Sequence, residues 1–337
     1  MRVAVLGMGV IGKRLVDAVT DQPDMTLSGV VVRSAGPGVL ARPGIPAFAF
    51  DADAAAGLTR AGVRPRGDLD DLLATTDVVV DAGPSRSGAG RVGLYRSSGV
   101  SAVFCGGERD RTLGPLIHSA LNYETAVGST GVRLASCNTT ALGRLVAAVG
   151  PEHVARLTAT VVRCATDSDK ASKGVVNGAV LDSGPSHHAS DLQQILPSLR
   201  AESHAITVPM TSGHVIGVRI QLHGSLDASA ALGRLTAAPR TTVLGPGPHS
   251  TSAIKASAAH RPGHRGDRHD LAVALQPTSA VELVGWLSLD NEAVTIPETL
   301  DVIRAVSGMD SQADARALTD KTLPPSGHWA ATTRTTW

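Results

Sequence analysis

The run Gly-Met-Gly-Val-Ile-Gly at residues 7–12 follows directly on an apolar stretch, Arg-Val-Ala-Val-Leu, at residues 2–6. Residues 13–20 then show helical periodicity, so the glycines stand in the strand–turn–helix order that is typical of a dinucleotide-binding loop. In such a loop the first glycine permits the tight turn, the second leaves room for a pyrophosphate, and the third lets the helix pack closely on the strand. A chance match is the alternative in a chain with 36 glycines. The predicted cofactor-binding residues of this loop are Gly7, Gly9, Val10, Ile11 and Gly12.

The second predicted strand, residues 26–32, ends in Arg33 and Ser34. A site that prefers NAD usually carries Asp or Glu at this position, where the carboxylate holds the ribose 2′-hydroxyl. A cation beside a hydroxyl attracts a 2′-phosphate instead. We therefore expect NADP as the favoured cofactor, bound by both residues, with NAD as the alternative. An arginine on a solvated loop is the competing interpretation of Arg33.

Further strands are predicted at residues 77–81 and 102–104, separated by helical or glycine-rich segments. Strands and helices that alternate in this way indicate a parallel, doubly wound α/β sheet of the Rossmann type. Glycines follow both strands, and ligands of such sheets bind at the carboxyl ends of the strands. We therefore assign Gly107 to the cofactor site and residues 1–136 to a dinucleotide-binding domain.

Cys137 lies in the run Ser-Cys-Asn-Thr-Thr at residues 136–140, just before a helix-like stretch at residues 141–149. The amino end of a helix stabilises a thiolate, which is the nucleophilic form of cysteine. A structural cysteine before a helix is the alternative, but a thiol that follows a dinucleotide fold is a candidate catalytic nucleophile. The neighbours predicted to contact a polar substrate are Ser136, Asn138 and Thr139.

The second half of the chain shows a different pattern. Longer strands rich in β-branched residues are predicted at residues 157–163, 204–208 and 215–222, with a helix at residues 190–199 between them. This order favours an α+β domain with a mixed or antiparallel sheet. The fold class is therefore a Rossmann sheet followed by an α+β catalytic domain.

Several side chains of this half could hold an anionic substrate. Arg163 closes one strand, and His187 and His188 precede the predicted helix, whose amino end can bind anions. His214 enters another strand and is the candidate general base, since a Cys–His pair moves a proton to or from the nucleophile. Surface or structural roles are the alternatives for each of the 12 histidines. Adjacent histidines in an extended segment are expected to point in opposite directions, and the tract at residues 260–269 to form an exposed loop, so no metal site is predicted.

The composition excludes several classes of protein. The chain has 31 basic and 30 acidic residues and lacks a basic stripe, which argues against a nucleic-acid partner. No apolar run reaches the length of about 20 residues that a membrane span requires. Three cysteines without paired or metal-like spacing fit a reducing compartment, and the chain opens on a strand instead of a signal peptide. We expect a cytoplasmic protein without a membrane partner.

Taken together, the motifs resemble the type II, archaeal-type phosphorylating glyceraldehyde-3-phosphate dehydrogenases. The matching stretches follow one another in order along almost the whole chain. They are Gly-Met-Gly-Val-Ile-Gly-Lys-Arg (7–14), Phe-Cys-Gly-Gly-Glu (104–108), Ser-Cys-Asn-Thr-Thr (136–140), Lys-Gly-Val-Val-Asn (173–177), Pro-Ser-His-His (185–188) and Ile-Pro-Glu-Thr-Leu-Asp-Val-Ile-Arg-Ala (296–305).

The resemblance implies a catalytic domain at residues 137–299, a C-terminal helical segment at 300–337 that packs back on the first domain, and a homotetramer that uses NADP or NAD. It implies that Cys137 attacks glyceraldehyde 3-phosphate, that hydride passes to the nicotinamide, and that inorganic phosphate releases 1,3-bisphosphoglycerate from a thioester in a reversible reaction of glycolysis and gluconeogenesis. Asn138 would position the reacting oxygen. The residues implied to hold phosphate groups are Thr139, Arg163, His187 and His188.

The chain departs from the family pattern at several positions. Cys164 stands where the family usually has a second arginine, and Ile216 replaces the second histidine of a His-x-His pair, which would share a face with His214. Asp290 and Asn291 replace a His-Gln pair, and we assign Asn291 to the cofactor site. Cys105 replaces a usual glutamine.

These departures leave two alternatives open. One is a paralogous dehydrogenase that acts on another aldehyde or acyl phosphate through the same thioester. The other is a nucleotide-binding protein that has lost the chemistry. In every case the expected partners are small molecules.

Overall fold

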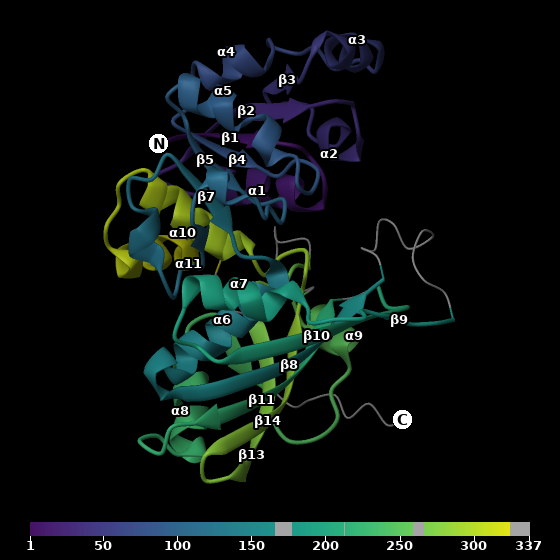
Figure 1. Cartoon of the computed structure of the whole chain (residues 1–337). Coiled ribbons are helices and arrows are strands. Elements are labelled where there is room, and N and C mark those ends of the chain that lie inside the picture. The colour runs from purple at the N-terminus through teal and green to yellow at the C-terminus, as the bar shows by residue number, and fades with distance from the viewer. Residues whose placement is uncertain (166–176, 212, 259–265, 324–337) are drawn as a thin grey trace. The chain divides into compact units, whose positions relative to one another are not determined.

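The computed structural model describes residues 1–165, 177–211, 213–258 and 266–323 (Figure 1). The chain divides into two compact units. Unit 1 comprises Met1–Ala135 and Ile296–Leu323, and the described part of unit 2 lies within Ser136–Thr295. The motif at residues 173–177 lies outside the described residues except for Asn177, and the predicted C-terminal segment is described only as far as Leu323.

Unit 1 is built on a parallel sheet whose described strands run in the order β3-β2-β1-β4-β5-β7-β6. Every pairing in it is parallel, and the chain order reverses between β1 and β4, which makes the sheet doubly wound. The strand order and the helical crossovers confirm the predicted Rossmann class. The strands are β1 (Arg2–Leu6), β2 (Thr26–Val32), β3 (Ala47–Ala49), β4 (Val78–Asp81), β5 (Ser101–Phe104), β6 (Leu116–Ile117) and β7 (Gly131–Leu134).

The helices of unit 1 come from both ends of the chain. A C-terminal helix, α10, is buried along its whole length and packs against α1 and α11. Its Arg304 is fully buried and pairs with Asp24 at 2.7 Å, which anchors the C-terminal segment to the loop before β2. The helices are α1 (Val10–Thr20), α2 (Pro37–Leu40), α3 (Ala52–Arg60), α4 (Leu69–Leu73), α5 (Val92–Ser97), α10 (Ile296–Val306) and α11 (Gln312–Thr322), with 3-10 turns at Gly88–Gly90, Arg111–Leu113 and Tyr123–Ala126.

Unit 2 contains a mixed sheet in the order β12-β13-β14-β11-β8-β10-β9. β8 pairs with β10 in parallel and with β11 in antiparallel orientation, which confirms the predicted mixed sheet. The strands are β8 (Val154–Cys164), β9 (Val180–Leu181), β10 (Ala201–Val208), β11 (His214–Leu222), β12 (Thr241–Val243), β13 (Leu271–Ser279) and β14 (Glu282–Leu289).

Helix α6 is the central helix of unit 2. It packs against two other helices, α7 and α8, and against strands β8 and β14 (Figure 1). Apolar side chains and a buried arginine of this helix fill the layer between the helices and the sheet. The helices are α6 (Cys137–Val149), α7 (His187–Ile195), α8 (Ala228–Ala237) and α9 (Thr251–Ala256), with a 3-10 turn at Pro151–His153.

Two local predictions for unit 2 were wrong. The helix expected at residues 190–199 is α7, which begins three residues earlier, at His187, because Ser186 takes the extended conformation of an N-cap. The tract expected to be an exposed loop is described from residue 266 onward, and Asp267, Arg268 and His269 are buried there. Buried ion pairing explains this burial, since the Arg268 guanidinium lies 3.6 Å from the carboxylate of Asp270. Within the described residues, no helix is both long and apolar enough to cross a membrane.

Candidate active site

The glycine-rich loop between β1 and α1 lines a cavity of about 270 Å³ in unit 1. Gly7 has a positive φ of 91°, and a Cβ added to it would lie 2.8 Å from the carbonyl oxygen of Ala82. A Cβ at Gly12 would lie 1.9 Å from the carbonyl oxygen of Gly7, so only glycine allows α1 to approach the strand this closely. A Cβ at Gly9 would meet nothing within 4 Å. Two glycines are therefore needed for packing, whereas the space at the third is open to a ligand.

The start of α1 is suited to an anionic ligand. Gly9 is its N-cap and supplies no side-chain cap, and the first turn carries no acidic residue. The first N–H groups of a helix bind anions readily, because they lack partners within the helix and lie at the positive end of its dipole. Val10 and Ile11 are the first two residues of this turn. The loop thus has the form that a pyrophosphate requires.

Arg33 and Ser34 lie on the wall of the same cavity as Gly7 and Gly9. Both are exposed, and the guanidinium carbon of Arg33 lies 4.1 Å from the centre of the Phe50 ring. A guanidinium over an aromatic face is held there by the ring quadrupole. Phe50 was not singled out in the sequence, because it follows β3, a strand that the sequence analysis did not predict. The structure thus presents an oriented cation and a hydroxyl at the end of β2.

A buried ion pair supports the loop after β4. Arg91 donates to both carboxylate oxygens of Asp81, at 2.7 and 2.9 Å, and Asp81 also accepts from the Tyr95 hydroxyl and the Gly83 N–H. Burial, followed by the charge of Asp81, raises the pKa of Tyr95 far above its usual range, so this hydroxyl remains a donor. The network fixes Gly83 at the edge of the cavity beside the glycine-rich loop. This network of hydrogen bonds was not apparent in the sequence, because a turn and a helix separate Asp81, Arg91 and Tyr95.

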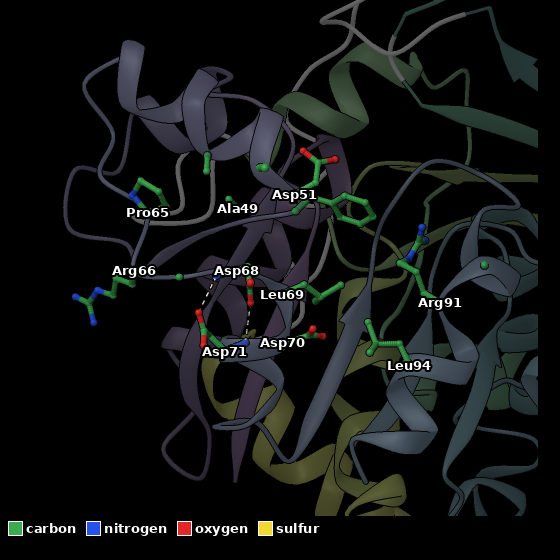
Figure 2. Close-up of a pocket in the computed structure, with 15 residues that line it drawn as sticks. Ala49, Asp51, Pro65, Arg66, Asp68, Leu69, Asp70, Asp71, Arg91 and Leu94 are labelled. Atoms are coloured by element: carbon green, nitrogen blue, oxygen red, sulfur yellow. Dashed lines mark hydrogen bonds between the residues drawn. The ribbon is translucent and has the colours of Figure 1, made fainter.

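A second cavity, of about 710 Å³, adjoins the first and shares Phe50 and Arg91 with it. Figure 2 shows Arg91 and Leu94 on one side of this cavity and, on the other, four carboxylates at the amino ends of α3 and α4: Asp51, Asp68, Asp70 and Asp71. Asp68 and Asp71 are engaged in a reciprocal capping box of α4. The carboxylates disfavour a phosphate group in this second cavity. Gly107, with a φ of 67°, lies on the loop after β5.

In unit 2 the structure places Cys137 at the first position of α6. Ser136 is its N-cap, with Oγ 3.4 Å from the N–H of Thr139 and 3.0 Å from the Thr139 hydroxyl. The thiol is half-buried, while Asn138 and Thr139 are buried. A thiolate at this position gains from the free N–H groups and the dipole of the helix, as the sequence argument expected.

His214, the first residue of β11, lies beside this thiol. Its Nδ1 is 3.8 Å from the sulfur of Cys137 and 3.0 Å from Oδ1 of Asn138. Both distances are within hydrogen-bond reach, and the histidine is buried. Ile216, two residues further along the strand, is fully buried in the core. The family usually has histidine at both positions, 214 and 216. This chain keeps only the histidine at position 214, and that histidine contacts the thiol.

The two adjacent histidines do not point in opposite directions, which corrects the prediction. They form the first turn of α7 and not an extended segment, and their ring centres lie 4.1 Å apart with an angle of 30° between the planes. His188 is buried, with Nε2 3.2 Å from Nδ2 of Asn138, whereas His187 is half-exposed and lies 3.8 Å from Asp191. The structure thus joins His188 to the residues around Cys137.

Arg163, near the end of β8, pairs with Asp182 at 2.5 Å. The Nε of this arginine is buried without a hydrogen-bond partner among the described residues. The next residue, Cys164, is buried and its thiol lies 3.8 Å from Oδ1 of Asn291, so Asn291 lines this part of unit 2. Asp290 pairs with Lys255 at 3.3 Å and is buried. Among the described residues, no cluster of three or more acidic, histidine or cysteine side chains could hold a metal ion.

Comparisons with known proteins bear on both units. Residues 136–247 match the model of the glyceraldehyde 3-phosphate dehydrogenase C-terminal domain, and residues 1–107 match that of the dihydrodipicolinate reductase N-terminus. A glyceraldehyde-3-phosphate dehydrogenase of Aeropyrum pernix is 35% identical over 319 residues, covering 91% of this chain and 92% of the relative. The chain belongs to the glyceraldehyde-3-phosphate dehydrogenase family. The resemblance seen in the sequence is thereby confirmed.

Other relatives extend this result. Glyceraldehyde-3-phosphate dehydrogenases of Hyperthermus butylicus and Archaeoglobus fulgidus are 33% and 30% identical, each covering 96% of this chain and 97% of the relative. These relatives are archaeal, in agreement with the archaeal-type branch. Among solved structures, aspartate semialdehyde dehydrogenase II from Vibrio cholerae has a TM-score of 0.66 at 11% identity, covering 91% of this chain and 98% of that chain. This likeness concerns the fold alone. Membership in a dehydrogenase family, together with the loop of unit 1, supports a nicotinamide cofactor.

Proposed function

We propose that this protein catalyses the reversible, phosphorylating oxidation of glyceraldehyde 3-phosphate with NADP as the favoured coenzyme. The observation that carries the proposal is the thiol of Cys137 at the start of α6, with Nδ1 of His214 at 3.8 Å, in a chain of this family. A thiolate at a helix terminus is a soft nucleophile that adds to an aldehyde to form a hemithioacetal. Oxidation of the hemithioacetal gives a thioester.

In this scheme the sulfur of Cys137 bonds to the aldehyde carbon, and the carbonyl oxygen takes up a proton to give a hemithioacetal. When bound, the oxidised nicotinamide supplies the acceptor for the hydride, and His214 is the proposed base that takes up the hydroxyl proton. Inorganic phosphate then attacks the thioester carbon, and the thiolate leaves as the acyl phosphate forms. Asn138 orients the reacting oxygen, and the side chains proposed to hold phosphate groups are Ser136, Thr139, Arg163 and His187. His188 is not among them, because its two ring nitrogens already contact Ser186 and Asn138.

The preference for NADP rests on Arg33, which the Phe50 ring holds at 4.1 Å on the wall of the cofactor cavity. Ser34 adds a hydroxyl at the same place. A guanidinium binds a phosphate with charge-assisted hydrogen bonds, whereas it gains little from a ribose hydroxyl. The fingerprint residues and Gly107 complete the proposed cofactor site, to which Asn291 is assigned from the resemblance.

The function is tested by following reduced coenzyme at 340 nm with glyceraldehyde 3-phosphate, NADP and inorganic phosphate. We expect turnover that depends on phosphate and that is lost in Cys137→Ser. Cys105→Ser is the matched control and should retain activity, because burial followed by the charge of Asp81 raises the pKa of Cys105 to about 12. Full turnover of Cys137→Ser would exclude every thioester scheme.

A second candidate substrate class is favoured by one observation. Asp182 already engages Arg163 at 2.5 Å, and Cys164 supplies no second cation beside it. An aldehyde with a smaller or singly charged anionic group would need less positive charge at this place than a phosphate ester. Turnover of such an aldehyde, for example an amino-acid semialdehyde, without turnover of glyceraldehyde 3-phosphate would select this candidate.

Assembly and domain boundaries are also proposals. The resemblance supports a homotetramer in the cytoplasm, with functional domains at residues 1–136 and 137–299 and a C-terminal segment at 300–337. Light scattering on purified protein at micromolar concentration tests the assembly, for which a mass other than four chains would contradict the proposal.

A further inference from the structure

A chain of hydrogen bonds leads from the thiol of Cys137 into the interior of unit 2. Nδ1 of His214 lies 3.0 Å from Oδ1 of Asn138, and Nδ2 of the same amide lies 3.2 Å from Nε2 of His188. Nδ1 of His188 lies 3.0 Å from the hydroxyl of Ser186, which lies 2.7 Å from the hydroxyl of Ser203. All five residues are buried, and they come from β11, α6, α7, the loop before α7, and β10.

The direction of this chain is set at its inner end. The hydroxyl of Ser203 donates to the carbonyl oxygen of Ser186 at 3.1 Å and accepts from the N–H of Ala189 at 3.0 Å. A serine hydroxyl has one proton and two lone pairs. Since the proton of Ser203 is directed to the carbonyl oxygen, the 2.7 Å contact between the two hydroxyls is donated by Ser186.

The direction of the Ser186 proton also decides which ring nitrogen of His188 carries a proton. Because the Ser186 proton points to Ser203, its oxygen accepts in the 3.0 Å contact with His188, and Nδ1 of His188 carries the proton. In the neutral ring Nε2 is then an acceptor, as it must be to receive the N–H of the Asn138 amide at 3.2 Å. A protonated Nε2 would place two donors face to face.

The orientation of the Asn138 amide also decides which ring nitrogen of His214 carries a proton. Its nitrogen faces His188, so its oxygen faces His214 at 3.0 Å, and an amide oxygen only accepts. Nδ1 of His214 therefore carries a proton. In the 3.8 Å contact with Cys137 this N–H is the donor and the sulfur is the acceptor.

We propose that Ser186 and Ser203 are positioning residues, which act through His188 and Asn138 to hold His214 in the Nδ1–H form and thereby present a hydrogen-bond donor to the sulfur of Cys137. This inference rests on the proposed role of Cys137 as the nucleophile. In this arrangement Nδ1 of His214 stabilises the thiolate instead of removing the thiol proton. A donor aimed at an anion strengthens the charged form, as does the amino end of α6.

The chain has one alternative polarity, in which the amide of Asn138 is turned over. Its oxygen would then face His188, which would carry its proton on Nε2, and Nδ1 of His214 would become an acceptor. The Ser203 hydroxyl disfavours this arrangement. Ser186 would have to donate to His188, so Ser203 would have to turn its proton from the carbonyl oxygen of Ser186 to the hydroxyl of Ser186. Removal of the Ser203 hydroxyl therefore permits both polarities.

The tautomers are measured directly by long-range ¹H–¹⁵N correlation on the ¹⁵N-histidine-labelled full chain, with His188→Gln and His214→Gln used to assign the signals. We expect Nδ1–H for both rings in the wild type and a mixture of tautomers in Ser203→Ala. The alkylation rate of Cys137 by iodoacetamide at pH 7 should fall about tenfold in Ser203→Ala, which is the size expected for a weakened hydrogen bond to a charged group. Ser190→Ala is the matched control, since Ser190 is exposed and its hydroxyl donates to the backbone carbonyl oxygen of His187 at 2.9 Å.

Nε2–H on either histidine in the wild type overturns the inference, as do unchanged tautomers in Ser203→Ala. Should Ser203→Ala fail to fold, Ser186→Ala provides the same test, and the wild-type spectrum is decisive by itself. None of these spectra requires an aldehyde or a coenzyme. A protein with the expected tautomers but without glyceraldehyde 3-phosphate oxidation would refute the proposed function and leave the assignment of the hydrogen bonds intact.

Discussion

The glycine-rich loop of unit 1 and the thiol site of unit 2 differ in the atoms that give them their shape. The loop is shaped by backbone, with glycines at places where a Cβ would meet a carbonyl oxygen at 1.9 or 2.8 Å. The thiol site is shaped by buried side chains from several elements, joined by hydrogen bonds from His214 to Ser203. A backbone site tolerates changes in most neighbouring side chains, whereas a buried polar network loses its order when one member is removed. The two sites should therefore fail in different ways when they are mutated.

The largest expected effect concerns packing in the loop. Gly12→Ala places a Cβ 1.9 Å from the carbonyl oxygen of Gly7, so α1 must move away from β1. We expect the free energy of unfolding to fall by about 3 kcal/mol or more, since overpacking of a rigid site typically costs about 1–3 kcal/mol. Urea unfolding followed by circular dichroism measures the change.

Gly9→Ala is the matched control in the same loop. Its Cβ meets nothing within 4 Å, so stability should change by less than about 0.5 kcal/mol while coenzyme affinity falls. Equal loss of stability in both variants would contradict the assignment of the open space at Gly9 to a ligand.

The next effect concerns the network of unit 2. Asn138→Ala removes the amide that links His214 to His188 and leaves two buried histidines without this partner. We expect kcat to fall about 100-fold, the size found when one oriented donor is removed from an active site. Steady-state kinetics should show little change in the KM for coenzyme, because the proposed binding loop for the coenzyme phosphates lies in unit 1. A lower free energy of unfolding with an unchanged kcat would show that Asn138 contributes to packing and not to catalysis.

Cys105 and Cys137 allow a comparison of thiol reactivity. Burial, then the charge of Asp81, raises the pKa of Cys105 to about 12, whereas Cys137 lies at a helix terminus. A raised thiol pKa means that the thiolate is scarce at pH 8 and becomes abundant only as the pH approaches 12. We expect iodoacetamide at pH 8 to modify Cys137 and to spare Cys105, as peptide mass spectrometry can show. Faster modification of Cys105 than of Cys137 would refute the prediction that Cys137 is the more reactive thiol.

The smallest effects concern the cation at the end of β2. Arg33→Ala should lower kcat/KM for NADP about tenfold and leave that for NAD almost unchanged, since one charge-assisted contact to the 2′-phosphate is lost. Phe50→Leu removes only the ring that orients Arg33 at 4.1 Å, and an exposed cation–π contact is worth about 0.5–1 kcal/mol. The expected loss is therefore about threefold, and only for NADP. An equal loss for both coenzymes would indicate a contact with the adenosine instead.

The loop of unit 1 could be predicted from the sequence because its residues are contiguous and its constraint is local. The strand at residues 2–6 and the strand at residues 26–32 were predicted with the bounds that the structure shows. The position of Cys137 at the start of a helix was also visible, because Ser136 is a favoured N-cap residue.

The network of unit 2 could not be predicted to the same extent. Ser203 lies 66 positions after Cys137 in an ordinary β-strand pattern, and nothing in its neighbourhood marks it as a hydrogen-bond partner. The stacking of His187 on His188 depends on where α7 begins, and helix boundaries are the least certain part of a sequence-based assignment. The burial of Arg268 depends on Asp270 and on strands that are distant in the sequence. Contacts of this kind are properties of the tertiary fold.

Every step of the proposed reaction depends on Cys137 as the carrier of the acyl group. Intact-protein and peptide mass spectrometry after incubation with glyceraldehyde 3-phosphate and NADP, in the absence of phosphate, tests it most directly. We expect a stoichiometric 3-phosphoglyceroyl adduct on the peptide that contains Cys137, which disappears when inorganic phosphate is added and does not form in Cys137→Ser. Formation of reduced coenzyme without an adduct on this cysteine, or an adduct on Cys105 or Cys164, would contradict it.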